Sequence, residues 1–371
     1  MLVQRCDGSP ASVHRLSDAV AAALRGADTV LPLGNDDSPL LADAGQPPSG
    51  TAVVIATSGS TGKPKGVLLS GAALRASASA THARLGGPGR WLLALPAQHV
   101  AGLQVLVRSL LAGVAPAVYD LGDGFEPERF RAEGCRYTAL VPTQLVRLLD
   151  AGGSGLAALR EFDAVLLGGA STPPELRARA EEAGVRVVTT YGMSETAGGC
   201  VYDGVPLDGV RVRVAAENGS GPLELGGPTL ATGYLGQPEL TGRVFADGWF
   251  RTGDLGRLTE HGRVQVLGRA DDVIITGGVK VAPEVVERAL RAQPGVRDAC
   301  VVGVPDDEWG QVVGAVVVAG APFDRDALLA GVRAALGGPA TPKILRALDV
   351  LPLRGIGKPD RQAVRRLLGP S

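Results

Sequence analysis

Lysine and cysteine are scarce in this chain of 371 residues, and their number and spacing argue against several kinds of binding site. Only five of the 37 basic residues are lysines, the 38 acidic residues balance the basic ones, and lysines and arginines together form no dense basic block. We therefore expect no sequence-independent grip on nucleic acid. The four cysteines, Cys6, Cys135, Cys200 and Cys300, form no Cys-x-x-Cys pair. This spacing argues against structural zinc and a disulfide framework, and predicts four small buried side chains.

Long hydrophobic runs are also missing. No apolar run approaches the roughly 20 residues that span a bilayer, and residues 1–8 lack a basic stretch followed by an apolar signal core. We therefore expect no membrane span and a cytoplasmic location. With 45% hydrophobic and 20% charged residues and a net charge of -1, the composition is that of a globular chain with a substantial core and two domains.

Apolar runs alternate with helical patterns along the first half of the chain. The runs lie at 51–57, 91–95, 137–141 and 164–167, and the helical patterns at 71–84, 102–112, 142–150 and 173–183. Such alternation predicts a layered α/β architecture. From about residue 200 the chain changes to short β-like pieces, at 210–214, 221–225 and 263–267, which predict a β-rich subdomain.

The last hundred residues have a mixed pattern of their own. A helix starting at Pro283 is followed by strands at 299–304 and 312–318 and by a helix at 325–336. The predicted fold class is therefore α/β, with a large N-terminal domain (1–269) of layered α/β plus the β-rich subdomain. A small, mobile α+β domain (270–371) completes the chain.

The strongest local signal is the segment Thr57-Ser58-Gly59-Ser60-Thr61-Gly62-Lys63-Pro64-Lys65-Gly66, which follows an apolar run. It offers exposed backbone amides, hydroxyl groups and two ammonium groups, a combination that suits a polyphosphate. It is not a Walker A loop, because Thr57 stands where the first glycine would be and Pro64 where the Ser/Thr magnesium ligand would be. Taken alone, the segment also fits a surface turn.

This loop resembles the phosphate-binding signature of the adenylate-forming superfamily, which contains acyl-CoA synthetases, luciferases and adenylation domains. Four further motifs of that superfamily follow in family order, and the resemblance covers residues from about 50 to the end. They are Tyr191-Gly192-Met193-Ser194-Glu195-Thr196, Phe250-Arg251-Thr252-Gly253-Asp254, Gly268-Arg269-Ala270-Asp271-Asp272 with Gly277-Gly278, and Gly357-Lys358-Pro359-Asp360-Arg361.

The resemblance implies a role for each matching position. Asp254 holds the ribose hydroxyls, Tyr191 lies against adenine, and Glu195 binds Mg²⁺ on the ATP phosphates, a hard cation that prefers oxygen ligands. Arg269 contacts the ribose or the α-phosphate. The implied ATP- and AMP-binding set is Thr57, Ser58, Gly59, Ser60, Thr61, Gly62, Lys63, Lys65, Gly168, Gly169, Ala170, Tyr191, Gly192, Asp254 and Arg269.

The resemblance also implies two half-reactions, with Lys358, Glu195, Ser194 and His99 as the catalytic group. Lys358 bridges the substrate carboxylate and the α-phosphate during adenylate formation. Asp271 is the hinge, and rotation there replaces Lys358 by the loop of Gly277 and Gly278, which admits coenzyme A. Lys280 and Lys343 have no assigned role and are expected to be surface charges.

The acyl pocket is implied by two further segments. His99 lies in a stretch that resembles the family's pocket wall, and residues 191–210, including Gly198 and Gly199, look most like the short o-succinylbenzoate-CoA ligases of menaquinone biosynthesis. A dicarboxylate substrate needs a cation for its second carboxylate. Arg108, which interrupts the apolar helical pattern, is the candidate, and an Arg108 that faces solvent is the equal alternative.

The function that the resemblance implies is an ATP-dependent acid-thiol ligase that converts o-succinylbenzoate to o-succinylbenzoyl-CoA in menaquinone biosynthesis, with ATP, Mg²⁺, coenzyme A and the carboxylic acid as its cosubstrates and partners. Three alternatives stay open: a ligase for another acyl or aryl acid, a stand-alone adenylation protein that loads a carrier protein, and a nucleotide-binding protein without turnover. The last is disfavoured by the intact Lys358 and Glu195. The sequence leaves open whether the chain forms a homodimer.

Overall fold

The structure is a computed structural model that describes residues 1–35, 37, 41, 44–58, 64–215, 219–320, 323–354 and 358–369. For Ser58, Pro64, Arg354 and Lys358 the description covers the backbone only. Contacts group the chain into two compact units. The first comprises Met1–Arg213, Glu224–Thr252 and Glu260–Val264, and the second comprises Val214–Leu223, Gly253–Thr259 and Gln265–Ser371.

A five-stranded sheet opens the first unit, with the strand order β1-β2-β3-β4-β14. Its strands are β1 (Leu2–Arg5), β2 (Val30–Leu33), β3 (Thr51–Ser58), β4 (Pro64–Ser70) and β14 (Gly233–Tyr234). Helix α1 (Pro10–Leu24) lies against β1, β2 and β3. Strands β3 and β4 pair antiparallel, from Thr51 opposite Ser70 to Ser58 opposite Pro64.

A seven-stranded sheet follows, with the order β11-β10-β9-β8-β7-β5-β6. The run from β6 to β9 is parallel, and β10 and β11 are antiparallel. The strands are β5 (Trp91–Leu93), β6 (Ala117–Val118), β7 (Tyr137–Leu140), β8 (Ala164–Leu167), β9 (Val187–Met193), β10 (Gly198–Tyr202) and β11 (Val205–Pro206). In parallel sheets ligands bind beyond the carboxyl ends of the strands, so this edge is where a site is expected.

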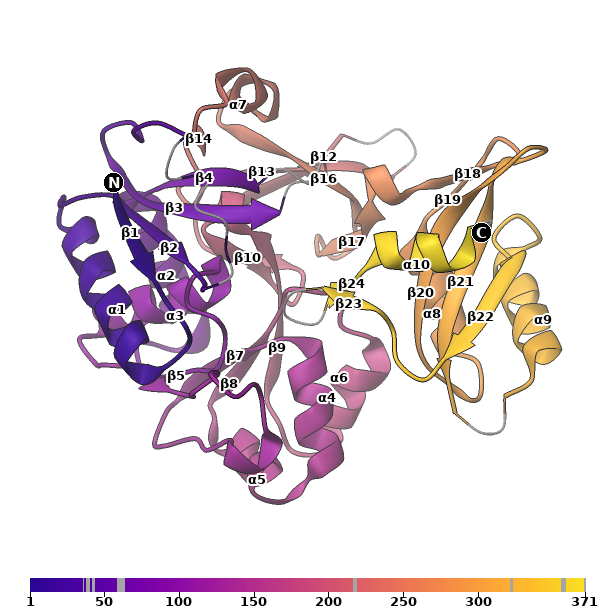
Figure 1. Cartoon of the computed structure of the whole chain (residues 1–371), viewed down its shortest axis with the longest axis horizontal. Helices are drawn as coiled ribbons and strands as arrows, with labels where there is room; N and C mark the ends of the chain where they lie inside the picture. The colour runs from indigo at the N-terminus through magenta and orange to yellow at the C-terminus, as the bar shows by residue number, and fades with distance from the viewer. Residues whose placement is uncertain are drawn as a thin grey trace. The chain divides into compact units, whose positions relative to one another are not determined.

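Helices cover both faces of the seven-stranded sheet (Figure 1). On one face, α4 (Pro142–Ala151), α5 (Gly153–Glu161) and α6 (Pro174–Glu182) bury leucines against alternate residues of β5, β7, β8 and β9. On the other, α2 (Gly71–Leu85) and α3 (Val100–Ala112) pack on each other, α2 contacting β3 and β4 and α3 contacting β5, β7 and β10. The two helices therefore form a layer between the two sheets.

Local sequence explains where these helices begin and end. Ser70 caps α2, its hydroxyl accepting from the Ala73 amide at 3.1 Å, and Gly86 ends the helix with a φ of 87°. Pro142 and Pro174 occupy the first helical positions of α4 and α6, where a missing amide proton costs nothing.

A third sheet has the order β12-β13-β16-β15, with β17 beside β16. Its strands are β12 (Arg211–Val214), β13 (Gly221–Gly226), β15 (Phe245–Ala246), β16 (Trp249–Leu258) and β17 (Val264–Arg269), and α7 (Pro238–Val244) precedes β15. These short strands are the β-rich subdomain that the sequence predicts.

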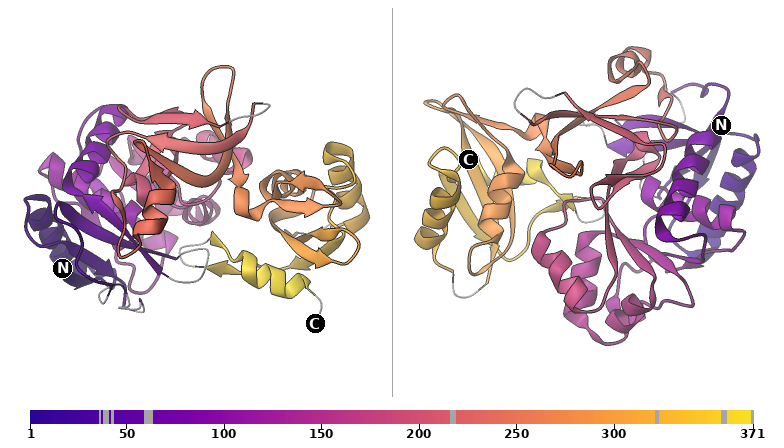
Figure 2. Two further views of the ribbon diagram at one scale, coloured as in Figure 1. Left: turned by 90° about the horizontal axis from the view of Figure 1, so that it is seen from above. Right: turned by 180° about the vertical axis from the view of Figure 1, so that it is seen from behind.

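The second unit contains a five-stranded sheet with β18 (Ile274–Thr276), β19 (Val279–Val281), β20 (Val296–Asp306), β21 (Gly310–Ala319) and β22 (Ile344–Leu348). Helices α8 (Pro283–Arg291) and α9 (Arg325–Leu336) pack on one face, and α10 (Arg361–Leu368) packs on the other (Figure 2). Alternate residues of β20 and β21 point to the two apolar clusters. A short hairpin of β23 (Leu353–Arg354) and β24 (Lys358–Pro359) precedes α10.

The predicted α/β class is confirmed, and most predicted elements lie within a few residues of the observed ones. Among the elements that the sequence prediction missed are β1, α1 and β2 before residue 50, β4, β9 and β10 beside the predicted site, and β22 and α10 near the end. All four cysteines are buried and free, as expected. Within the described residues, no helix combines the length and apolarity needed to cross a membrane.

Candidate active site

The predicted phosphate loop connects β3 to β4, so a buried strand feeds it as expected. Five residues of the loop, Gly59, Ser60, Thr61, Gly62 and Lys63, lie outside the described residues, and Ser58 is described by its backbone alone. At the base of the hairpin, Thr57 pairs with Lys65, and the Thr57 hydroxyl donates to the Lys65 carbonyl at 3.4 Å. The hairpin fixes both ends of the loop at one place in the first unit.

Tyr234 connects this hairpin to Glu195. Its hydroxyl donates to Glu195 Oε1 at 2.8 Å, and Lys65 Nζ lies 5.5 Å from the centroid of its ring. Strand β14 pairs with β4, and the Leu235 amide donates to the Gly66 carbonyl at 2.8 Å, which holds the tyrosine in this position. Burial and then the Glu195 charge raise the pKa of the Tyr234 phenol well above its usual range, so the hydroxyl stays a donor. The Glu195 carboxylate and the Lys65 ammonium group thus both contact the Tyr234 side chain.

The sequence prediction missed Tyr234. The only signal is the Gly233-Tyr234 pair, and its glycine has a structural reason: Gly233 has a φ of 146°, and a Cβ there would lie 2.4 Å from Thr241 Cγ2. The Ala231 amide donates a hydrogen bond to the Glu195 carbonyl at 2.8 Å, which fixes the backbone of Glu195 as well.

The turn that carries Glu195 is built from close backbone approaches. A Cβ on Gly192 would lie 2.2 Å from the Gly198 carbonyl oxygen, so β9 and β10 can come together only with glycine there. The Thr196 hydroxyl accepts from the Met193 amide at 2.9 Å and donates to the Gly198 carbonyl at 2.7 Å. Ser194 is buried at the start of this turn. The turn is therefore rigidly tied to the end of β9.

The predicted adenine-binding residues lie at the carboxyl edge of the parallel strands. Gly168, Gly169 and Ala170 follow β8 directly, and Tyr191 is near the end of the neighbouring β9. A Cβ on Gly168 would lie 2.4 Å from the Thr190 hydroxyl, and Gly169 has a φ of 83°. The structure therefore brings the glycine turn and the strand of Tyr191 together, as the sequence motifs require.

The predicted acyl-pocket residues lie where α3 faces β10. His99 is the N-cap of α3, and Gly102, whose Cβ would lie 2.3 Å from the Pro96 carbonyl oxygen, lets the helix start close to that chain. Gly198 faces the Gln104 side chain, with a Cβ position 3.2 Å from Gln104 Cγ, and Gly199 follows it on β10. The start of α3 and the start of β10 therefore lie close together in the first unit.

Arg108 is buried, with only 3% of its surface exposed, so the alternative in which it faces solvent is wrong. Its guanidinium lies 4.8 Å from the centroid of the Trp91 ring, and Nη2 donates to the Tyr202 hydroxyl at 3.4 Å. Nε has no partner, and no carboxylate of the described chain pairs with this cation. Burial lowers the pKa of Arg108, a sign of how poorly its charge is solvated.

Other polar atoms around Arg108 lack partners too. Within the described residues, buried atoms without a hydrogen bond include His82 Nε2 on α2, Trp91 Nε1 on β5, and Gln104 Oε1 and Ser109 Oγ on α3. Arg108 and Gln104 are one helical turn apart on α3. Tyr202 is four residues beyond Gly198 on β10, a span of about 13 Å at the usual rise of a strand. Buried polar atoms without a partner therefore lie around Arg108, on α2, α3 and β5.

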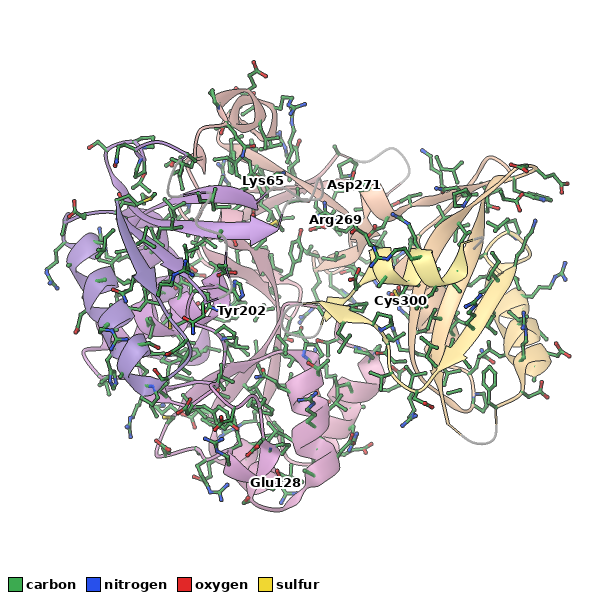
Figure 3. The ribbon with its side chains drawn as sticks, viewed as in Figure 1. Lys65, Glu128, Tyr202, Arg269, Asp271 and Cys300 are labelled. Carbon is green, nitrogen blue, oxygen red and sulfur yellow. The ribbon has the colours of Figure 1, made fainter. Side chains whose placement is uncertain are left out.

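In the second unit, Arg269 joins two predicted site residues. Its Nη1 lies 3.4 Å from Asp254 Oδ1, and its Nη2 lies 3.2 Å from Asp271 Oδ2. Asp254 is buried on β16, and Figure 3 shows Arg269 beside Asp271 at the start of the predicted hinge. The Arg269 guanidinium thus links Asp254, the carboxylate predicted to hold the ribose, to Asp271, the predicted hinge residue.

Gly277 and Gly278 form the turn of the β18–β19 hairpin, with φ values of 55° and 81°. A Cβ on Gly277 would lie 2.6 Å from the Trp309 ring, so the glycine allows close contact with that indole. Lys343 Nζ lies 3.8 Å from the centroid of the same ring, and Lys280 is exposed on β19. Both lysines are exposed, as the sequence suggested, and Lys343 in addition packs on an aromatic ring.

The backbone of Lys358 lies in β24, paired with Arg354 of β23, while its side chain is outside the described part of the structure. Among the described residues no cluster of three His, Cys, Asp or Glu side chains could hold a metal ion alone. Glu195 is a fitting ligand for Mg²⁺ all the same, because this ion is usually held by one or two carboxylates together with substrate phosphates.

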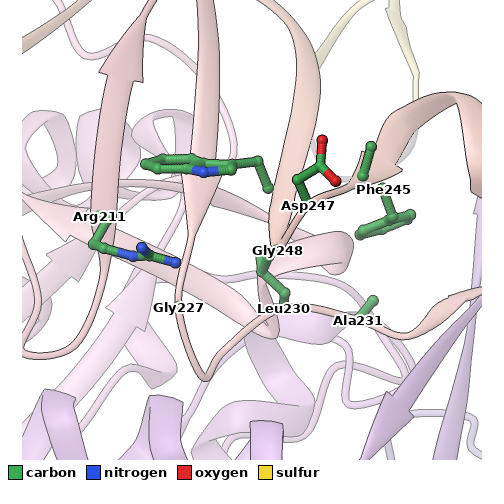
Figure 4. A pocket seen from close by; sticks show the side chains of 9 residues that line it. Arg211, Gly227, Leu230, Ala231, Phe245, Asp247 and Gly248 are labelled. Atoms are coloured by element: carbon green, nitrogen blue, oxygen red, sulfur yellow. The ribbon is translucent and has the colours of Figure 1, made fainter.

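A cavity of about 400 Å³ in the first unit has no predicted site residue in its lining, although Ala231 in that lining donates to the Glu195 carbonyl and Phe245 packs on Tyr234. Figure 4 shows Arg211, Asp247 and Phe245 around it. Both Arg211 and Arg213 lie over the Trp249 ring, at 4.8 Å and 4.2 Å from its centroid. None of the motifs discussed above contributes to this cavity, and the site is therefore better located by the contacts of Lys65, Tyr234 and Glu195.

Comparison with known proteins agrees with the motifs. Residues 9–235 match the AMP-binding enzyme family, and residues 285–358 match the AMP-binding enzyme C-terminal domain. A probable 2-succinylbenzoate–CoA ligase of Mycobacterium tuberculosis is 51% identical over 331 residues, which cover 86% of this chain and 85% of the relative.

Solved structures agree as well. E. coli MenE with bound OSB-AMS has a TM-score of 0.80 and 29% identity, covering 99% of this chain and 87% of that one. The amide bond synthetase McbA from Marinactinospora thermotolerans has a TM-score of 0.81 and 29% identity, covering 100% and 80%. The matches confirm the predicted superfamily, fold class and enzyme class, an AMP-forming acyl-CoA ligase. The chain belongs to the AMP-binding enzyme family.

Proposed function

We propose that this protein is an ATP-dependent ligase that converts 2-succinylbenzoate to its coenzyme A thioester. In the first half-reaction a carboxylate oxygen attacks the α-phosphorus of ATP, which forms the acyl-adenylate and releases pyrophosphate. In the second, the coenzyme A thiol attacks the acyl carbon, which releases AMP. The single observation that carries the first step is the contact of Tyr234 with both Glu195 and Lys65.

That contact supports a specific division of labour. Glu195 holds Mg²⁺ on the ATP phosphates, and Lys65 and the loop amides bind the phosphate oxygens. Tyr234 donates a hydrogen bond to one oxygen of Glu195 and so orients the other toward the metal. Tyr191 and the Gly168 turn take the adenine, while Asp254 and Arg269 take the ribose and the α-phosphate side. We also assign Ser194 and His99 of the first unit to the catalytic group.

Arg108 supports the choice of a dicarboxylate. The buried Arg108 guanidinium has only the Tyr202 hydroxyl and the Trp91 ring as partners within the described residues. These partners do not offset the cost of moving its charge out of water, because that requires an ion of opposite sign nearby. The second carboxylate of 2-succinylbenzoate is such an ion, and His82 Nε2 and Trp91 Nε1, which have no hydrogen-bond partner within the described residues, are nitrogens that can donate to its oxygens. The name of the 51% identical relative fits the same substrate.

The roles of the second unit are proposals of the same kind. We assign Asp271 as the hinge between a domain of residues 1–269 and one of 270–371, with Lys358 serving adenylate formation and the Gly277–Gly278 turn serving coenzyme A. Because ATP and coenzyme A are metabolites of the cytoplasm, we also place the enzyme there.

The test is a panel of carboxylic acids with ATP, Mg²⁺ and coenzyme A, followed by mass spectrometry of the thioester. We expect 2-succinylbenzoyl-CoA as the dominant product. Thioester formed only from other acyl or aryl acids would identify a related ligase instead. Acid-dependent pyrophosphate release without any transfer to free coenzyme A would favour the protein that loads a carrier.

A further inference from the structure

Arg361 lies in a cage of three carboxylates in the second unit. Its guanidinium contacts Asp272 Oδ2 at 3.4 Å, Glu284 Oε1 at 3.3 Å and Glu287 Oε1 at 2.8 Å. All four side chains are largely buried, with side-chain exposures between 9% and 24%. A planar guanidinium can satisfy several acceptors at fixed angles at once, which an ammonium group cannot. The cage therefore defines the orientation of Arg361 and not only its charge.

The three carboxylates come from the elements around the predicted hinge. Asp272 follows the hinge residue Asp271 directly. Glu284 lies in the first turn of α8 and packs against Gly268, where φ is 138° and a Cβ would lie 2.0 Å from Glu284 Oε2. Glu287 also accepts from the Val301 amide at 2.9 Å, which ties the cage to β20.

Arg361 is the first residue of α10 and follows Lys358 by three residues, so at most about 10 Å of backbone separates them. The intervening chain is fixed as well. The Asp360 carboxylate caps α10 by accepting from the Gln362 and Ala363 amides, each at 3.0 Å, and the Asp360 amide donates to the Pro352 carbonyl at 2.8 Å. The backbone of Lys358 is thus held on one side by β23 and on the other by the cage.

We propose that Arg361 is a positioning residue for adenylate formation: its carboxylate cage fixes the Lys358 segment to the hinge. This inference rests on the role proposed above for Lys358. It predicts that Arg361 matters for the half-reaction that uses Lys358. The transfer to coenzyme A, which uses the Gly277–Gly278 turn, should not depend on it.

The experiment separates the two half-reactions in the full-length protein. Adenylate formation is followed by pyrophosphate release from 2-succinylbenzoate and ATP, and transfer is followed with synthetic acyl-adenylate and coenzyme A. Arg361→Lys keeps the positive charge but loses the planar guanidinium that contacts three carboxylates at once. We expect kcat for adenylate formation to fall about 100-fold, the usual effect of a misplacement near 1 Å, with KM for ATP unchanged and transfer kept within about twofold.

Two variants complete the design. Arg365→Gln removes one charge from the exposed side of the same helix, with no ion pair in the described structure, and should leave both half-reactions unchanged. Asp272→Asn weakens the cage from its hinge side and should repeat the selective loss, which keeps the test valid if an Arg361 variant folds poorly.

Equal loss of both half-reactions in Arg361→Lys and Asp272→Asn, in step with a lower melting temperature, would show that the cage serves folding alone. Full adenylation by both variants, while Lys358→Ala abolishes it, would also overturn the proposal. Full adenylation by Lys358→Ala is a separate failure, because it removes the role assigned to Lys358 itself.

Discussion

Replacement of Arg108 by methionine should leave the free protein about as stable as before and yet impair use of the dicarboxylate. The substitution removes a cation–π contact with Trp91, about 2 kcal/mol for a desolvated pair, and a long hydrogen bond to Tyr202, about 1 kcal/mol. It also removes the penalty of a buried charge, several kcal/mol. Thr81 keeps a 3.0 Å hydrogen bond to the Tyr202 hydroxyl, so no new polar atom is orphaned.

Substrate binding should respond in the opposite way. Removal of one partner of a buried, hydrogen-bonded charge pair costs about 2–5 kcal/mol, which corresponds to roughly 30-fold to several thousand-fold in kcat/KM. The loss should be confined to acids that carry the second carboxylate. The control acid is the monoacid, 4-oxo-4-phenylbutanoate or 2-butanoylbenzoate, that the natural protein adenylates, because that acid keeps the aromatic ring, the ketone and the reacting carboxylate.

The assay is the rate of pyrophosphate release for each acid, alongside the melting temperature of each protein without ligand. We expect Arg108→Met to lose the preference for 2-succinylbenzoate and to melt within a few degrees of the natural protein. If both acids lose activity equally and the melting temperature drops sharply, Arg108 supports the fold and the assignment of the second carboxylate to it is refuted.

Further predictions concern the metal ligand, the buried histidine and the hinge. Tyr234→Phe keeps the ring beside Lys65 but removes the hydrogen bond to Glu195, so about tenfold more Mg²⁺ should be needed for half-maximal adenylation; an unchanged Mg²⁺ titration would contradict this. Burial, and then the neighbouring guanidinium, lower the pKa of His82 below 6.5, so the unfolded chain binds a proton more readily. The free energy of unfolding should therefore fall as the pH drops below about 6.5, and His82→Gln should flatten that slope in denaturant titrations. Asp271→Pro should spare one half-reaction and cripple the other, whereas equal loss of both would count against domain alternation.

The sequence predicts the site's local parts well because these depend on neighbouring residues. A strand that ends at a glycine turn places Gly168 and Tyr191 at one edge of the sheet, and a hairpin base places Thr57 opposite Lys65. The runs at 51–57 and 164–167 and the glycine turns after them follow from the order of the residues. The strands that carry Lys65 and Tyr191 were not predicted. The same reasoning finds β3, α2, α8 and α9 within a residue or two.

Tyr234 could not be found in this way. Its position depends on the pairing of β14 with β4, and the Thr232 hydroxyl bonds to the Leu68 carbonyl across 164 residues of chain. A two-residue strand carries no periodic signal, and the Glu195 that it contacts belongs to a third segment. Only tertiary structure joins these three pieces.

Arg108 and Arg361 illustrate a second limit. An arginine within an apolar helical pattern predicts either a solvent-facing residue or a buried one, and the periodicity does not decide between them. Arg108 is buried with an aromatic ring and a hydroxyl, whereas Arg361 finds its carboxylates 74 to 89 residues earlier in the chain. In both cases the environment of the charge is set by packing between distant segments.

The most direct test of the whole account is the exchange of labelled pyrophosphate into ATP by the purified protein, with Mg²⁺ present and coenzyme A absent. We predict exchange that depends on 2-succinylbenzoate and is at least about 100-fold slower in Lys358→Ala. Exchange that proceeds equally without an acid, or none with any acid of the panel, would contradict the claim that this site forms an acyl-adenylate.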